Sequence, residues 1–68
     1  MKLSQCKQIL AYLAEHGSIT AWEAMAELHI MRLASRIHDL RRMGYDIARE
    51  MVTTNGKRYA VYRLEAAA

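Results

Sequence analysis

MRLASRIHDLRRM, residues 31–43, is the stretch that decides how the chain folds, because it predicts a helix with two chemically different sides. The apolar side, with spacings of three and four residues, consists of Ile30, Leu33, Ile37 and Leu40. The polar side, half a turn away, consists of Arg32, Ser35, Asp39 and Arg42, with Arg36 and His38 on its flanks. One side suits a hydrophobic core, and the other offers the groups with which a helix can read an anionic duplex. An ordinary amphipathic helix with a solvated charged face is the alternative.

The length of 68 residues predicts a single domain, residues 1–68, that buries about 60% of its unfolded surface. Hydrophobic residues make up 53% of the chain, charged residues 25%, and there is no proline, so the composition argues against disorder. The single Cys6 cannot form an internal disulfide, which favours a reducing, intracellular setting. No apolar run approaches the roughly 18 residues of a membrane span, so we expect no membrane association.

Charge is distributed unevenly along the chain. The net charge is +3, with a sequence pI near 9.4. Residues 1–30 carry a net charge of −1, whereas residues 31–68 carry eight Lys or Arg against four acids, a net charge of +4. A basic second half is expected when one side of a domain faces phosphates. A solvated surface could show the same asymmetry by chance.

The first half of the chain predicts two short helices. Ser4 is a good N-cap for a helix over residues 5–16. Thr20-Ala-Trp-Glu23 has the form of a capping box, which predicts a second helix over residues 21–28. Ser18-Ile19, between the two helices, is too short for an independent strand but could add a few hydrogen bonds to the edge of a sheet.

The second and third helices are separated only by the tight turn of residues 28–31. A short helix, a turn and a longer basic helix, here about residues 32–43, form the helix-turn-helix pattern. His29 stands where a left-handed backbone, usually glycine, is needed, and histidine tolerates that conformation better than most residues. Trp22 lies off the inner face of the second helix. We expect it to fold back over the first helix; an exposed anchor for a partner is the alternative.

From Asp46 the apolar period changes from 3.6 to 2, and Asn55-Gly56 predicts a hairpin over about residues 47–64. A two-residue turn pairs Thr53 with Arg58, Met51 with Ala60, Arg49 with Tyr62, and Ile47 with Leu64. The face predicted to cover the helices holds Ile47, Met51, Ala60, Tyr62 and Leu64. Arg49 is the one misfit in this register. We exclude Ala66–Ala68 from the fold.

The predicted fold class is therefore α+β: a three-helix winged helix-turn-helix with a C-terminal β-hairpin wing. The tip of the wing carries two hydroxyls, an amide and two cations, in the run Thr53-Thr54-Asn55-Gly56-Lys57-Arg58. Arg41 falls near the apolar side of the third helix. We expect its stem to lie on the core while its head reaches water or the carboxyl end of the helix.

The sequence also resembles a family of small helix-turn-helix proteins encoded by phages and prophages. The resemblance rests on His16–Thr20, Glu23-Ala24, Ile30–Ile37, Asp39-Leu40-Arg41 and Gly44-Tyr45, and it extends over about residues 5–64. It implies a winged helix-turn-helix fold, DNA binding and a place in the cytoplasm of a bacterial host, associated with the nucleoid. His29, where the family usually has glycine, is the clearest departure.

If DNA is the partner, the third helix enters the major groove and its first two turns lie nearest the bases. We expect base or near-base contacts from Arg32, Ser35 and Arg36, and a phosphate contact from Arg42. Asp39 could accept a hydrogen bond from cytosine, but an intrahelical pair with an arginine is the preferred interpretation.

The remaining candidate contacts lie outside the third helix. Lys57 and Arg58, helped by Asn55 and Thr54, would meet the DNA backbone or the minor groove. Thr20, at the start of the second helix, could meet a phosphate because helix N-termini favour anions.

Enzymatic interpretations are disfavoured. The three histidines and Cys6 show no zinc spacing, and the chain lacks a phosphate-binding glycine loop and a Ser-His-Asp arrangement. We therefore expect no metal, no cofactor and no small-molecule substrate.

Two functions remain open. The first is binding of double-stranded DNA, as a small transcriptional regulator or an excisionase-like architectural factor, and a homodimer on DNA is compatible with it. The second is a protein-interaction module that binds a host or phage protein through Trp22, Tyr59 and the outer face of the hairpin.

Overall fold

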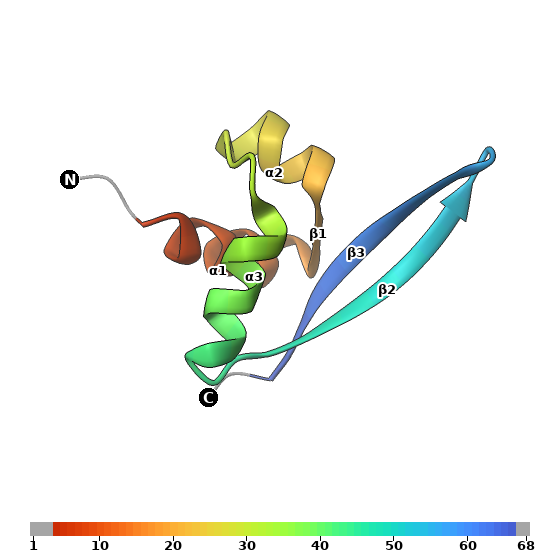
Figure 1. Cartoon of the computed structure of the whole chain (residues 1–68). Helices are drawn as coiled ribbons and strands as arrows, with labels where there is room; N and C mark the ends of the chain where they lie inside the picture. Colours follow the sequence, from red (N-terminus) through yellow and green to blue (C-terminus); the bar gives the residue numbers. More distant parts are fainter. Residues whose placement is uncertain (1–3, 67–68) are drawn as a thin grey trace.

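Each helix begins and ends close to the residues that the sequence indicates. The computed structural model describes residues 4–66. The elements are α1 (Gln5–His16), β1 (Ser18–Thr20), α2 (Ala21–Leu28), α3 (Leu33–Arg42), β2 (Asp46–Thr54) and β3 (Lys57–Ala66) (Figure 1). The expected α+β class, three helices with an antiparallel hairpin wing, is confirmed. α3 begins one residue later and ends one residue earlier than expected.

The helix ends are fixed by local hydrogen bonds. The Ser4 hydroxyl accepts from the Lys7 backbone N–H at 3.2 Å. The capping box of α2 is confirmed: the Thr20 hydroxyl accepts from the Glu23 N–H at 3.1 Å, and the Glu23 carboxylate accepts from the Thr20 N–H at 3.0 Å. His29 has the expected left-handed backbone, with φ 58°. These contacts hold α2 at a fixed position before the turn that leads into α3.

The sheet has the strand order β1-β3-β2, and all pairs are antiparallel. The predicted hairpin register is confirmed, from Thr53 opposite Arg58 to Ile47 opposite Leu64. Asn55 and Gly56 both have positive φ, as a two-residue type I′ turn requires.

Two strands, β1 and β3, extend farther than the sequence predicted. β1 pairs with β3 as an edge strand, and it extends one residue beyond Ser18-Ile19, to Thr20. Excluding Ala66 from the fold was wrong, because Ala66 pairs with Asp46 at the end of β3. Ala67 and Ala68 lie outside the described residues.

The core lies where the three helices meet β1 and the part of the hairpin that is farthest from its turn. Its buried members are Ile9, Leu13, Ile19, Ala24, Ile30, Leu33, Ile37, Leu40, Ile47 and Tyr62. The apolar stripe predicted for residues 30–40 is therefore buried in full. Burial of this stripe fixes the rotation of α3 about its axis, so its polar side must face solvent.

Only part of the hairpin belongs to this core, and the rest projects from the helices (Figure 1). Ile47 is 3% exposed, whereas Met51, on the same face of β2, is 43% exposed. Met51 was expected to cover the helices, but it lies beyond them. We call residues 46–49 with 62–66 the hairpin base, and residues 53–58 the hairpin tip.

Two side chains differ from expectation. Trp22 does not fold back over α1; it is 71% exposed. In the contact between α1 and α2, the Tyr12 hydroxyl donates instead to the Glu23 carboxylate at 3.2 Å. The head of Arg41 was expected to reach water or the carboxyl end of α3, but it binds the neighbouring strand instead. Its Nε and Nη2 donate to the backbone oxygen of Ile47, at 3.1 and 2.8 Å.

Candidate nucleic-acid interface

The polar side of α3 faces solvent at the residues expected to approach a ligand. Arg32 is the N-terminal cap residue of α3, is exposed, and makes no side-chain capping bond. Ser35 and Arg42 are also exposed. These three side chains therefore remain available on the side of α3 that faces away from the core.

Arg36 and Asp39 form the intrahelical pair expected from their spacing. Arg36 Nη1 lies 3.5 Å from Asp39 Oδ2, and the side chains are 37% and 39% exposed. Arg36 Nε is buried and has no hydrogen-bond partner in the described structure. The pair holds the Arg36 guanidinium close to the helix, so its remaining N–H groups are the ones that could reach a base edge.

The hairpin tip presents its polar residues to solvent. Thr54, Asn55, Lys57 and Arg58 are all exposed. Within residues 4–66, Arg32, Arg42, Lys57 and Arg58 form no ion pair, and we call these four residues the free cations. Arg63 differs from them, because it pairs with Glu50 at 3.4 Å on the outer face of the hairpin. Lys7 on α1, Arg41 and Arg49 also form no ion pair within residues 4–66, so the free cations are the part of the unpaired positive charge that lies on the predicted contact residues.

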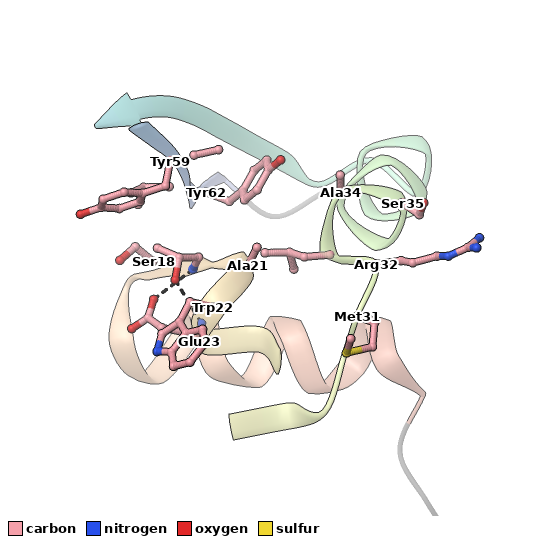
Figure 2. Close-up of a pocket in the computed structure, with 14 residues that line it drawn as sticks. Ser18, Ala21, Trp22, Glu23, Met31, Arg32, Ala34, Ser35, Tyr59 and Tyr62 are labelled. Atoms are coloured by element: carbon pink, nitrogen blue, oxygen red, sulfur yellow. Dashed lines mark hydrogen bonds between the residues drawn. The ribbon is translucent and has the colours of Figure 1, made fainter. Parts of the chain in front are cut away.

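A groove of about 800 Å³ separates the beginnings of α2 and α3 from β3 (Figure 2). Among the predicted contact residues, it brings together Thr20, Arg32 and Ser35. Arg36, Asp39, Arg42 and the tip residues do not line it. In Figure 2 the Arg32 side chain points away from the groove, while Tyr59 and Tyr62 lie on the hairpin side. The groove thus lies between the beginning of α3 and the wing.

The sequence indicated Trp22 and Tyr59 as a possible protein-binding surface, but it did not indicate that they lie in one groove. The groove is also lined by Trp22, Met31 and Tyr59, which are 71%, 76% and 41% exposed. Each lies outside the apolar stripes that form the core, and that is the feature of the sequence which could have indicated exposure. Their convergence depends on the packing of α2 against the hairpin, which the sequence pattern does not show.

Thr20 is less free than expected. Its hydroxyl oxygen already accepts from the Glu23 N–H, and the Glu23 carboxylate places negative charge at the start of α2. The hydroxyl proton can still be donated to a phosphate oxygen. Partial burial, the hydrogen bond to Glu23 and the charges of Glu23, Glu27 and Glu15 raise the pKa of Tyr12 above its ordinary 10.0. Acidic side chains of α1 and α2 thus gather around Tyr12.

The family model described as "Winged helix-turn-helix domain" matches residues 4–67. This chain belongs to that family. The winged helix-turn-helix identity inferred from the helix pattern and the wing is therefore confirmed, and so is the expected family. Winged helix-turn-helix domains are generally DNA-binding modules and typically have no enzymatic activity.

Among solved structures, this winged helix-turn-helix domain is similar to Stf76 from the Sulfolobus islandicus plasmid-virus pSSVx. The TM-score is 0.80 at 27% sequence identity, and the match covers 94% of this chain and 84% of that chain. No curated protein matches the sequence at a significant level. The neighbour's origin in a plasmid-virus agrees with a small phage-type family.

Two further observations concern the described residues alone. None of the helices there has the length and apolar character that crossing a membrane requires. No three His, Cys, Asp or Glu side chains in the same part of the chain come together as a metal site.

Proposed function

We propose that this winged helix-turn-helix domain binds double-stranded DNA, with α3 in the major groove and the hairpin tip on the backbone or in the minor groove. It would act as a small phage-type transcriptional regulator or an excisionase-like architectural factor, in the cytoplasm of a bacterial host and associated with the nucleoid. The observation that supports this proposal most is the position of the free cations. They lie on α3, whose beginning borders the groove, and on the tip of the hairpin whose strand β3 lines the other side of that groove.

Each contact residue has a proposed role. Arg32, Ser35 and Arg36 approach the base edges, since they lie in the first turns of α3, and an arginine can donate two hydrogen bonds to guanine. Arg42 meets a phosphate near the end of α3. Asp39 orients Arg36 through the 3.5 Å pair, which leaves direct acceptance from cytosine as its lesser role.

The wing and the start of α2 supply backbone contacts. Lys57 and Arg58 meet phosphates, and Asn55 and Thr54 add uncharged hydrogen bonds. Thr20 donates its hydroxyl proton to a phosphate on the other side of the groove. One copy of so small a domain contacts few base pairs, so pairing of two copies on DNA accords with the proposal.

The test is a fluorescence-polarisation titration with a random duplex at about 50 and 200 mM salt. If Arg42, Lys57 and Arg58 each meet a phosphate, the affinity falls by about fortyfold between these salt concentrations. Arg42→Ala and Lys57→Ala should each reduce the slope of log K against log salt by about 0.9. Lys7→Ala, an exposed cation on α1, is the matched control and should leave the slope unchanged. Affinity that is absent, or independent of salt, would overturn the proposal.

A second candidate function is binding of a host or phage protein, and the exposed groove residues favour it. Trp22, Met31 and Tyr59 are residue types enriched at protein interfaces. Trp22 is the single tryptophan of the sequence, so its emission reports directly on the groove. If a protein occupies the groove, Trp22→Ala leaves DNA affinity unchanged and duplex DNA leaves the Trp22 emission unchanged. A shift in emission on adding DNA would count against this candidate.

A further inference from the structure

The last turn of α3 and the hairpin base meet through one side chain. Arg41 Nε and Nη2 both donate to the backbone oxygen of Ile47, at 3.1 and 2.8 Å. The planar guanidinium presents these two donors side by side at a fixed spacing. A lysine ammonium carries the same charge but cannot offer this paired geometry. Arg41 is thus a directional contact between a helix and a strand.

The chain around this contact is built as a tight joint. Only residues 43–45 connect α3 with β2. The Gly44 N–H donates to the Arg41 oxygen at 3.1 Å, and the Tyr45 N–H donates to the Leu40 oxygen at 3.2 Å, which closes α3. The strand register shifts between Asp46 and Ile47, and such irregularities bend a strand. Arg41 therefore holds β2 directly after its bend.

The length of the wing makes this position important. From Ile47 to Thr54 the strand extends about 23 Å, at about 3.3 Å per residue. A rotation of about 10° at the base would therefore move the tip by about 4 Å, which exceeds the length of a hydrogen bond. Cations at the tip meet a phosphate reliably only if the base is fixed relative to α3.

We propose that Arg41 is a positioning residue that sets the angle between the wing and α3, so that both elements engage the same duplex. This inference rests on the proposed function, and it assigns Arg41 a role different from that of the free cations. The charge of Arg41 serves the fold, whereas the charges of Lys57 and Arg58 serve the ligand. Loss of Arg41 should therefore cost DNA affinity only while the wing cations are present.

A double-mutant cycle tests this dependence. Duplex affinity is measured for the wild type, Arg41→Met, Lys57→Ala/Arg58→Ala and the triple variant. Arg41→Met keeps the apolar stem and should weaken binding about tenfold with the wing intact, but less than about twofold without the wing cations. The same loss in both backgrounds would show that Arg41 itself meets a phosphate, and would overturn the inference.

Two further variants separate charge from geometry. Arg41→Lys keeps the charge, and we expect it to bind as weakly as Arg41→Met; full rescue by lysine would overturn the inference. Arg42→Met removes the neighbouring exposed cation, and it should weaken binding by a similar factor in both backgrounds. Circular dichroism at the assay temperature establishes that each variant is folded, and Arg41→Lys replaces Arg41→Met in the cycle if the methionine variant is not.

A measurement without DNA distinguishes failure of this inference from failure of the proposed function. Backbone ¹⁵N relaxation should show larger motion of residues 47–60 in Arg41→Met than in the wild type, with the order parameters of α1 unchanged. If the wild type fails to bind DNA but residues 47–60 become more mobile in Arg41→Met, the proposed function fails and the role of Arg41 in fixing the wing is retained. If the wild type binds DNA and the wing stays ordered in Arg41→Met, the inference alone fails.

Discussion

The hairpin base and the hairpin tip belong to the same two strands, yet their surroundings are opposite. At the base, Ile47 is 3% exposed and Tyr62 is 8% exposed, and β1 adds a third strand. At the tip, every residue from 53 to 58 is exposed, and two of them are free cations. From this difference we expect the base to serve stability and, on the proposed function, the tip to serve binding. Substitutions that affect one property without the other test this division.

The largest expected effect is on stability, at the base. Ile47→Ala removes a buried side chain from the core and should lower the free energy of unfolding by about 2 to 5 kcal/mol. Met51→Ala is the matched control on the same strand and face, and it should cost less than about 1 kcal/mol because Met51 is 43% exposed. Urea denaturation measures both. Equal losses would mean that the core extends farther along the hairpin than the division allows.

The next effect is on binding, at the tip. Lys57→Ala/Arg58→Ala should reduce the slope of log K against log salt by about 2 and leave the free energy of unfolding within about 0.5 kcal/mol of the wild type. Polarisation titrations and urea denaturation measure the two quantities. A destabilised double variant with unchanged DNA affinity would reverse the roles of base and tip.

The tip should show one smaller effect on stability, through its turn. Gly56 has φ +76°, and a Cβ added there would meet nothing within 4 Å. Gly56→Ala should therefore cost about 1 kcal/mol through backbone conformation alone. Gly56→Asn should cost less, because asparagine tolerates the left-handed region. If alanine costs nothing by thermal denaturation, the turn does not depend on this conformation.

The smallest expected effect is on the pH dependence of stability. It arises at Tyr12 on α1 and should change neither the hairpin base nor the hairpin tip. The raised pKa of Tyr12 means that the folded state favours the neutral phenol. The contribution of the neutral phenol to the free energy of unfolding is complete below pH 10 and is lost as the pH rises through the raised pKa. The difference in the free energy of unfolding between the wild type and Tyr12→Phe should therefore narrow as the pH rises above 10. A difference that is constant with pH would contradict the assignment.

Much of the fold could be predicted because local chemistry determines it. The capping box at Thr20 and the Asn55-Gly56 turn each specify a backbone conformation within four residues. Alternation of apolar residues then fixes the strand register, since a slip of one residue would exchange the two faces. The pair of Arg36 with Asp39 was predictable for the same reason, as it follows from helical spacing.

The errors concern contacts between segments that are distant in the sequence or lie across a bend. Trp22 was expected to pack on α1, but the α2 side chain that hydrogen-bonds α1 is Glu23, through Tyr12, and Trp22 is exposed. The partner of Arg41 depends on how the chain bends after Gly44. The groove needs α2, α3 and β3 together, and no periodicity within one of these elements indicates it. The DNA contacts themselves remain predictions.

The margin of the sheet has a consequence for how the protein behaves at high concentration. β2 is an outer strand: β3 pairs with one side of it, and no described strand pairs with the other. Unpaired backbone of this kind is a template for strand addition by another molecule, which leads to aggregation. Arg49 and Glu50 place exposed charges at the middle of β2, and charge at such a margin opposes strand addition. Arg49, the one residue that did not suit the predicted register, thus opposes strand addition between neighbouring molecules.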